Sequence, residues 1–485
     1  MRTVLALIFC ASLVSAQTAR HVVPSGGVTE GEALTEGTGW TLDYSGDSTN
    51  AIAGGDTIYL HGGTYTLTGT WVIYNDGYVG STGDPIIYRN YPGDTVKIVR
   101  GAAGVNLISV VGDSVWLWGL WIERTAADTN NVANVTPSAP GFKSINCIYK
   151  NSGGNALSMF QAATGAEAYG NIFLFCGTFY KPSDGGKRAY PIYAQNAMAN
   201  GWKYITDNIM AWPWTYGIHL YGSSAPLERF EVRGNTIFQA GWLDYDGATS
   251  IYSASTLLGI EADNPNGAAD SITFAHEHYW TNATNGYGGL FMDYNVGPPT
   301  NVKADSNISV AGSYSLWGFA STTYRSLIGN VFAPGWLPAD VDEAYTTNQW
   351  LTNRANVPDT VIVRMNAYES KRAHVVAYNL TGGDSISVNP TGFVSGDTLT
   401  FKSVQNLEGD TPFTVVYAGT AFNVPMAASR WTIETPITSA APESHPTGAL
   451  PETFPNFGVF LITGVAASEA PPAATSGKFA PFRKR

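Results

Sequence analysis

The stretch Asn235-Thr236-Ile237-Phe238 is one copy of a short unit in which an asparagine precedes mostly apolar residues. The unit recurs along the middle of the chain as Asn146-Cys147-Ile148-Tyr149, Asn171-Ile172-Phe173-Leu174, Asn208-Ile209-Met210, Asn307-Ile308-Ser309-Val310 and Asn330-Val331-Phe332. The steps between successive asparagines are 25, 37, 27, 72 and 23 residues, and the longest divides into 43 and 29 if His278 fills a missing copy. Coils of about 25 residues with inserted loops are typical of a parallel β-solenoid. The asparagines are predicted to stack from coil to coil, bonding to each other and to turn backbone.

A second set of short alternating strands lies between these copies. Its apolar members are predicted to point inward, at Leu157, Ile192, Ile218, Ile260 and Leu290. Because side chains alternate along a strand, the next residues form an outward row of Ser158, Tyr193, His219, Glu261 and Phe291. Two residues further on, a parallel outward row holds Phe160, Gln195, Tyr221, Asp263 and Asp293.

The whole pattern predicts an all-β protein, with a right-handed parallel β-helix over residues 22–350 and an antiparallel β-sandwich over residues 351–465. After residue 350 the strands are closely spaced and separated by turn residues, as in Thr398-Leu399-Thr400-Phe401. Residues 466–485 are predicted to form a linker rich in Ala, Pro and Ser that ends in a basic tail.

The N-terminus predicts a secretory signal at residues 1–16, because Met1-Arg2 precedes an apolar run and the small residues Ser15 and Ala16. This run is too short to span a bilayer, and no other stretch approaches about 20 apolar residues. We therefore predict no transmembrane segment and a protein that is secreted, extracellular or displayed at the cell surface.

Charge and cysteine usage narrow the function classes. The net charge of −12 argues against nucleic acid as a partner, because phosphate binding needs a basic surface.

Cys147 and Cys176 are the cysteines that remain once the predicted signal is removed. One disulfide between them is possible, but buried free thiols are favoured. No CxxC spacing occurs, which argues against a zinc site, so no metal ligands are predicted.

Several motifs, in this order, resemble those of the bacterial secreted right-handed parallel β-helix repeat proteins, a group of uncharacterised function in the pectate-lyase-like superfamily. They are GGDTIYLHGGTYTLTGTW (54–71), GSTGDPIIYRNYPGD (80–94), YGIHLYGSS (216–224), VIVRMNAYESKRAHVVAYNL (361–380) and PNFGVFLI (455–462). The resemblance covers nearly the whole mature chain and implies a β-helix with a C-terminal β-sandwich domain. The opening coils are also similar to those of β-helix polysaccharide lyases, but no catalytic residue carries over.

The outward rows supply the candidate site residues. The candidate catalytic residues are Tyr193, His219, Glu261, Asp263 and Asp293. Paired carboxylates could hydrolyse a glycosidic bond, and Tyr193 or His219 could act as the base of a lyase. The carboxylates could alternatively bind calcium as a cofactor. The candidate substrate-binding residues are Lys187, Arg188 and Arg229, which could neutralise a sugar acid, and Tyr221 and Phe291, which offer flat ring faces.

Three functions remain open from the sequence. The chain could be a polysaccharide lyase or glycoside hydrolase, a non-catalytic glycan-binding adhesin, or a structural surface or appendage protein that self-assembles. The partner predicted for the first two is an extracellular polysaccharide or a cell-surface glycan. An ordinary solvated surface is the alternative to any site, because outward positions of a solenoid are polar or aromatic in any case.

Overall fold

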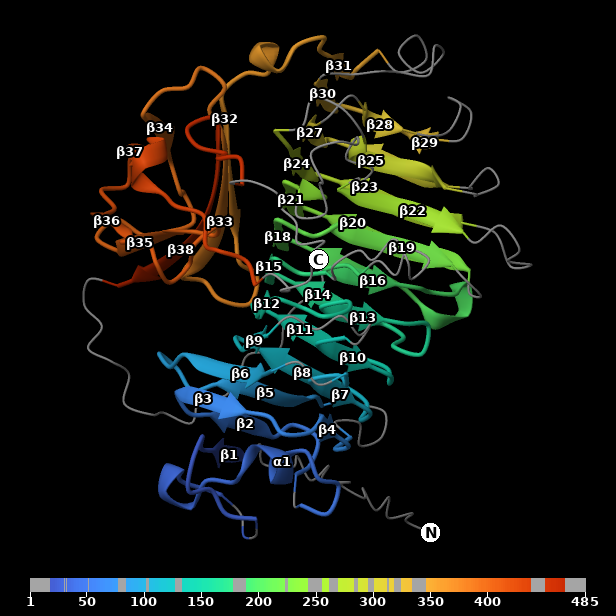
Figure 1. Cartoon of the computed structure of the whole chain (residues 1–485), viewed down its shortest axis with the longest axis vertical. Coiled ribbons are helices and arrows are strands. Elements are labelled where there is room, and N and C mark those ends of the chain that lie inside the picture. The colour runs from blue at the N-terminus through green and yellow to red at the C-terminus, as the bar shows by residue number, and fades with distance from the viewer. Residues whose placement is uncertain are drawn as a thin grey trace, which may run out of the picture. The chain divides into compact units, whose positions relative to one another are not determined.

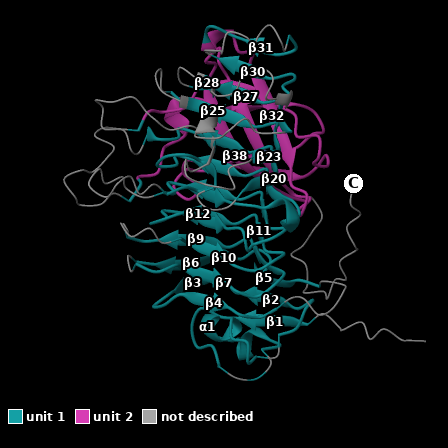
Figure 2. Cartoon of the chain, turned by 90° about the vertical axis from the view of Figure 1, so that its right-hand side faces the viewer, with its two compact units in different colours: residues 1–353, 436–450 teal, residues 354–435, 451–485 magenta. Residues whose placement is uncertain are grey.

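A computed structural model gives the fold of the chain (Figure 1). The structure describes residues 18–29, 31, 33–50, 52–76, 84–101, 104–126, 133–177, 189–222, 226–242, 255–260, 269–282, 287–294, 301–311, 314–317, 324–333, 346–437 and 450–466. The predicted signal segment and residues 467–485 of the predicted tail lie outside this description. The chain divides into two compact units, Met1–Asn353 with Pro436–Leu450 and Arg354–Thr435 with Pro451–Arg485 (Figure 2). No helix in the described ranges is long and apolar enough to cross a membrane.

The first unit consists of three parallel sheets, and consecutive strands of the chain enter them in turn. Sheet A contains β1 (Ala19–Val22), β2 (Thr57–Leu60), β5 (Ile86–Asn90), β8 (Val115–Trp118), β11 (Lys143–Ile145), β14 (Glu167–Tyr169), β17 (Lys203–Thr206), β20 (Leu227–Arg233), β23 (Ala269–Ala275), β26 (Val302–Asp305) and β29 (Tyr324–Ser326). Each full coil of three strands therefore returns the chain to the same sheet one strand further along, which defines a parallel β-helix.

The other two sheets are built in the same way. Sheet B contains β3 (Gly63–Thr66), β6 (Val96–Arg100), β9 (Trp121–Arg124), β12 (Ile148–Lys150), β15 (Ile172–Leu174), β18 (Ile209–Ala211), β21 (Thr236–Phe238), β24 (His278–Trp280), β27 (Ile308–Val310), β30 (Val331–Ala333) and β31 (Gln349–Trp350). Sheet C contains β4 (Trp71–Ile73), β7 (Ile108–Val110), β10 (Val135–Pro137), β13 (Leu157–Met159), β16 (Ile192–Ala194), β19 (Ile218–Gly222), β22 (Thr256–Ile260), β25 (Tyr287–Tyr294) and β28 (Tyr314–Trp317).

The second unit is antiparallel. One sheet has the order β32 (Thr360–Met365), β33 (Arg372–Tyr378), β38 (Phe457–Val465), β35 (Thr398–Ser403) and β36 (Phe413–Val416), and the other pairs β34 (Ser385–Val388) with β37 (Phe422–Pro425). A shared apolar core joins the two sheets, with Val388 and Val424 from the small sheet and Val375 and Phe401 from the large one. A β-helix followed by a β-sandwich confirms the predicted fold class.

Helices are few and short in the described residues. The α-helix α1 (Leu42–Ser45) lies near β4, and the 3-10 helices are η1 (Glu36–Thr38), η4 (Met198–Asn200), η7 (Arg354–Asn356) and η8 (Ala428–Arg430).

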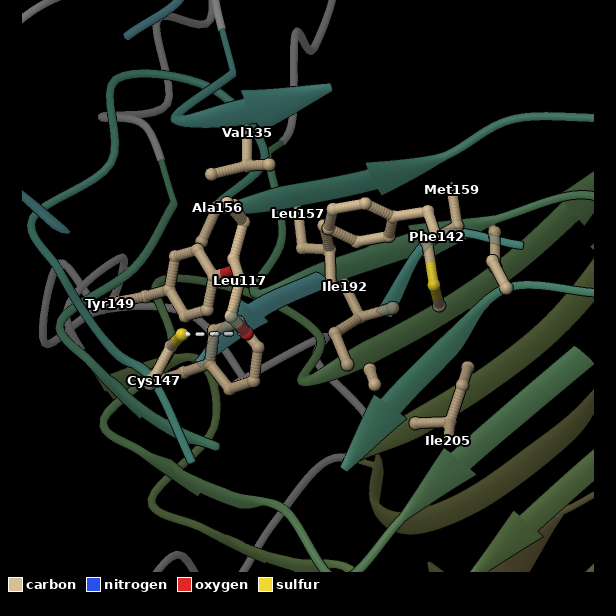
Figure 3. Packing of buried hydrophobic residues seen from close by; sticks show 14 of the residues in the cluster. Leu117, Val135, Phe142, Cys147, Tyr149, Ala156, Leu157, Met159, Ile192 and Ile205 are labelled. Carbon is tan, nitrogen blue, oxygen red and sulfur yellow. Dashed lines mark hydrogen bonds between the residues drawn. The ribbon is translucent and has the colours of Figure 1, made fainter. Parts of the chain in front are cut away.

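The core of the β-helix consists of side chains stacked in rows along its axis. In sheet B the rings of Tyr149 and Phe173, one coil apart, stack 4.7 Å apart between centroids and 8° from parallel. Leu157 and Ile192 of sheet C reach the same interior (Figure 3). Each fully buried side chain of this size stabilises the fold by about 1.5–3 kcal/mol, so the stacked rows supply much of the stability of the coil.

The predicted asparagine ladder lies at the turn from sheet A to sheet B. Asn208 Oδ1 accepts hydrogen bonds from the backbone N–H and the Nδ2 of Asn171, at 3.0 and 2.9 Å. Asn208 Nδ2 in turn donates to Asn235 Oδ1 and to the Ala168 carbonyl, both at 2.9 Å. The same pattern repeats from Asn307 to Asn330. These bonds satisfy polar groups that the interior hides from water, so each coil fixes the position of the next.

Two positions of the ladder were predicted one residue away from their true place. Cys147, not Asn146, occupies the ladder position, because its N–H donates to Asn171 Oδ1 at 2.9 Å. Glu277, not His278, continues the ladder, and its Oε1 accepts both the N–H and the Nδ2 of Asn235 at 3.0 Å. The physical reason is the turn geometry, which places a residue with positive φ just before the ladder residue. Asn146 takes this conformation, with φ 54°. Asparagine tolerates it better than most residues do.

The ladder also continues past the last predicted copy. Asn348 Oδ1 accepts from the N–H and Nδ2 of Asn330 at 2.9 and 2.8 Å. The step between these asparagines is only 18 residues, shorter than the other steps, which hid Asn348 from the repeat pattern.

Both cysteines of the described chain are free and buried, which confirms the favoured prediction. Burial raises the pKa of Cys147 to about 11 and that of Cys176 to about 12, because the thiolate loses its hydration. Neither thiol is therefore a nucleophile at neutral pH.

The ladder makes a direct prediction about stability. Replacing Asn208 by Ala leaves the N–H and Nδ2 of Asn171 without their acceptor, and each buried unsatisfied group costs about 1–3 kcal/mol. We expect Asn208→Ala to lower the free energy of unfolding by about 3 kcal/mol or more in urea denaturation. The matched control is Asn200→Ala, since the Asn200 side chain makes an exposed bond to the Gln161 carbonyl. Equal midpoints for the two variants would contradict a stabilising ladder.

Candidate functional site

The outer face of sheet C carries the row in which the sequence placed the site. Strand pairing aligns Ser158 with Tyr193 and Tyr193 with His219, as predicted. The row then continues through Leu257 to Phe291 and on to Trp317. The predicted alignment of Tyr193, His219 and Phe291 is therefore confirmed at the level of backbone register.

The register predicted for β22 is wrong by four residues. Thr256, not Ile260, pairs with Ile218, so Leu257 and not Glu261 stands beside His219, and Gly259 and not Asp263 stands beside Tyr221. The apolar alternation favoured Ile260 as the inward residue. Thr256 fits the interior because the Tyr279 hydroxyl, from sheet B, donates to its Oγ1 at 3.2 Å, which satisfies a buried polar group.

Four tyrosines surround His219 and form with it the His219 cluster, made of Tyr190, Tyr193, Tyr216, His219 and Tyr221. The imidazole centroid lies 4.0 Å from the Tyr190 ring and 4.9 Å from the Tyr221 ring, on which it stacks at 21°. The rings of Tyr193 and Tyr216 both lie at 5.4 Å. Phe291 packs against the cluster from β25. Tyr190, Tyr216 and His219 are buried, at 7%, 8% and 6% exposure, while Tyr193, Tyr221 and Phe291 are partly exposed. The part of the cluster that reaches solvent on the outside of β16 and β19 is therefore formed by Tyr193 and Tyr221.

Hydrogen bonds fix the partly exposed Tyr193 side chain against the backbone of Tyr221. The Tyr193 hydroxyl donates to the Tyr221 carbonyl at 3.0 Å. Gln195 Nε2 donates to that hydroxyl at 3.0 Å and to the same carbonyl at 3.1 Å. The Tyr193 ring is therefore held in place before any ligand arrives, which lowers the entropy lost on binding.

A buried lysine lies directly behind this surface. Lys203 begins β17 of sheet A, yet its Nζ donates to the carbonyls of Met159, Phe160 and Gln195 at 3.0, 2.5 and 2.6 Å. These carbonyls lie at and just beyond the ends of β13 and β16, so Lys203 ties together the two strand ends beside Tyr193. Burial lowers the pKa of Lys203 to about 7, because the ammonium loses its hydration.

The other predicted site residues divide into two groups. Glu261, Asp263, Lys187 and Arg188 lie outside the described residues, as does the side chain of Asp293, whose backbone belongs to β25. Arg229 lies in β20 of sheet A, where it interrupts the pairing with β23, so it does not share the outward row of Tyr193 and His219. In the described part of the chain, no group of three or more His, Cys, Asp or Glu side chains could hold a metal ion.

Sequence reasoning missed three members of this site. Tyr190 precedes Tyr193 by three residues, just as Tyr216 precedes His219 in the next coil, so this repeated spacing could have revealed both. Nothing in the sequence singles out Lys203, because two of the three carbonyls that its ammonium contacts, those of Met159 and Phe160, belong to the preceding coil.

Solved structures share this fold at low sequence identity. Pectate lyase Pel9A is 14% identical over 70% of this chain and 80% of that chain, with a TM-score of 0.49. A mannuronic acid specific polysaccharide family 6 lyase from human gut microbiota is 14% identical over 62% of this chain and 87% of that chain, with a TM-score of 0.31. Dettilon tailspike protein is 12% identical over 84% of this chain and 88% of that chain, with a TM-score of 0.30.

No family model and no curated protein matches the chain. The similarity to solved structures concerns the fold alone. The parallel β-helix and the C-terminal antiparallel sheets confirm the architecture that the sequence resemblance implied.

The pKa of Lys203 yields a test by pH. Between about pH 7 and the ordinary lysine value of 10.5, the unfolded chain binds more protons at this group than the folded chain, so stability rises with pH. The slope from one such group is at most about 1.4 kcal/mol per pH unit. We expect the free energy of unfolding of the native protein, measured by urea denaturation, to rise by about 1–2 kcal/mol between about pH 7.5 and about pH 9. The Lys203→Met variant lacks the titrating group and should not show this rise. Parallel pH profiles for the two proteins would contradict the lowered pKa of Lys203.

Proposed function

We propose that this chain is a secreted protein that binds an extracellular polysaccharide or a cell-surface glycan through the His219 cluster. The observation that carries the proposal is the set of four tyrosines around one imidazole on the outer face of sheet C. Tyrosines combine a flat apolar face with a polar tip, and such amphipathic rings are enriched where proteins recognise ligands.

The chemistry of the cluster favours a saccharide over a nucleic acid. Aromatic faces can cover the apolar face of a sugar ring, while the partly exposed Tyr193 hydroxyl, which donates to the Tyr221 carbonyl and accepts from Gln195, keeps a lone pair for a sugar hydroxyl. Phe160, which is 41% exposed, extends the surface because its ring lies 5.6 Å from that of Tyr193. The net charge of −12 opposes a polyphosphate ligand.

A catalytic version of this proposal is lyase activity on the same glycan. Tyr193 and His219 are the two groups of the row that can transfer protons, and their rings lie 5.4 Å apart. The base would remove the proton from the carbon next to the sugar carboxyl group, and the electron pair of that C–H bond would form a C=C bond as the glycosidic C–O bond breaks. The leaving oxygen would take a proton from the second group or from water. Hydrolysis by paired carboxylates would need Glu261, Asp263 or Asp293, whose side chains lie outside the described residues.

Binding to a glycan array and to a panel of polysaccharides tests the proposal. We expect Tyr193→Ala and Tyr221→Ala to weaken binding at least about tenfold, or about 1.4 kcal/mol, because each removes one stacking face. Tyr74→Ala is the matched control, since Tyr74 is 51% exposed and follows β4, four strands away from β16 in sheet C. Wild-type binding by both cluster variants, or no binding by any protein, would refute the proposal.

The same panel separates the catalytic from the non-catalytic version. Unsaturated products detected by ultraviolet absorbance, with and without calcium, would show β-elimination. In that case Tyr193→Phe and His219→Gln should lose activity while they retain most binding. New reducing ends without unsaturation would show hydrolysis, and binding without either product would leave an adhesive or structural protein.

A further inference from the structure

Exposed aromatic rings gather at one corner of the β-helix. The described chain exposes four large aromatic side chains, and Phe160, Trp202 and Tyr204 are three of them, at 41%, 37% and 38%. Phe160 and Trp202 lie in successive coils at the same turn, the one that leads from sheet C to sheet A. Phe160 begins this turn and its ring contacts Tyr193, whereas Trp202 ends it two residues before Tyr204, so Trp202 and Tyr204 are the pair of exposed rings on one segment. An exposed aromatic pair of this kind is a candidate surface for a ligand.

Trp202 and Tyr204 lie on the outer face of sheet A. Burial alternates along this segment, with Trp202 and Tyr204 exposed and Lys203 and Ile205 buried. Tyr204 of β17 pairs with Glu167 of β14 on one side and with Glu231 of β20 on the other. The Tyr204 phenol is therefore flanked by carboxylates on the two neighbouring coils.

Both flanking carboxylates already have cationic partners. Lys143 Nζ lies 2.6 Å from Glu167 Oε2, and Arg233 Nε lies 2.7 Å from Glu231 Oε1. Partial burial raises the pKa of Tyr204 and the two carboxylates raise it further, while Lys143 opposes them. The phenol is thus a neutral hydrogen-bonding group at physiological pH, and the charges around it are balanced.

A further aromatic ring lies along the same outward row. Trp116 of β8 pairs with Lys143, and the Lys143 ammonium lies 4.6 Å from the centre of its ring. Three strand spacings of about 4.8 Å separate Trp116 from Tyr204, so the row presents aromatic rings about 14 Å apart. Between them lie the paired Lys143 and Glu167, whose remaining lone pairs and N–H groups can bond to hydroxyls.

We propose that Trp202 and Tyr204 form a second saccharide-binding surface, on the outer face of sheet A, for an uncharged stretch of polysaccharide. The balanced charges favour an uncharged ligand, because a charged one would have to compete with existing ion pairs. Two exposed rings and flanking hydrogen-bonding groups suit a chain of neutral sugars. Phe160 lies between this surface and the His219 cluster, since its ring contacts Tyr193 while its carbonyl accepts from Lys203.

This inference goes beyond the proposed function, because the second surface can bind whether or not the His219 cluster does. Two surfaces on one chain would raise the apparent affinity for a long polysaccharide well above that for a short oligosaccharide. Such avidity depends on polysaccharide length, which neither surface alone would produce.

Affinity electrophoresis in gels that contain xylan, mannan, β-glucan or starch tests the inference on the full chain. We expect the double variant Trp202→Ala/Tyr204→Ala to lose retention at least about tenfold on the neutral polysaccharide that retains the native protein. Retention by this surface should persist at high salt, because salt screens attraction between charges and a neutral sugar is not bound by such attraction. Tyr74→Ala is again the control, and circular dichroism verifies the fold of each variant.

The outcomes separate the two proposals. Loss with Trp202→Ala/Tyr204→Ala but not with Tyr221→Ala would support the second surface and show that it binds the neutral polysaccharide independently of the His219 cluster. Loss with Tyr221→Ala alone would refute the second surface and leave the proposed function intact. Unchanged retention of a folded double variant on all four polysaccharides overturns the inference. The inference is also overturned if light scattering shows a dimer for the native protein and a monomer for the double variant, while retention is unchanged. The surface would then be an interface between copies of the chain.

Discussion

The asparagine ladder is the constraint on which the rest of the β-helix depends. Each ladder residue hydrogen-bonds to the backbone of the preceding coil, as Asn208 does with Asn171, and so sets the register of one coil on the next. Because the side chains of a strand alternate between two faces, a one-residue slip would exchange inward and outward residues. Glu277 preserves this register, since one of its carboxylate oxygens accepts the two bonds that an asparagine oxygen would accept.

The candidate sites follow from that register. With the coils aligned, Tyr193 falls beside His219 on sheet C, and Tyr204 falls between Glu167 and Glu231 on sheet A. Lys203 connects these two faces, because its backbone belongs to sheet A while its ammonium binds carbonyls at the end of sheet C. A rigid scaffold thus presents aromatic rings that are fixed before a ligand binds, which suits recognition of extended polymers.

The sequence predicted the architecture well because the repeat is local and periodic. The alignment of Tyr193 with His219 followed from two coils of nearly regular length. The prediction failed where the local pattern of apolar residues was compatible with two strand registers. The run around Leu257 is apolar at several positions, and only the bond from Tyr279 to Thr256 decides which residue points inward. Lys203 could not be found, because two of the three carbonyls that its ammonium contacts belong to the preceding coil.

The central claim is that the outer face of sheet C holds a glycan on the rings of the His219 cluster. The most direct test is a crystal structure of the full chain with an oligosaccharide selected from the array. The account predicts a sugar ring stacked on Tyr193 or Tyr221, with a sugar hydroxyl within hydrogen-bond distance of the Tyr193 hydroxyl. A bound oligosaccharide that leaves this face empty and lies only on the antiparallel sheets of the second unit would contradict it.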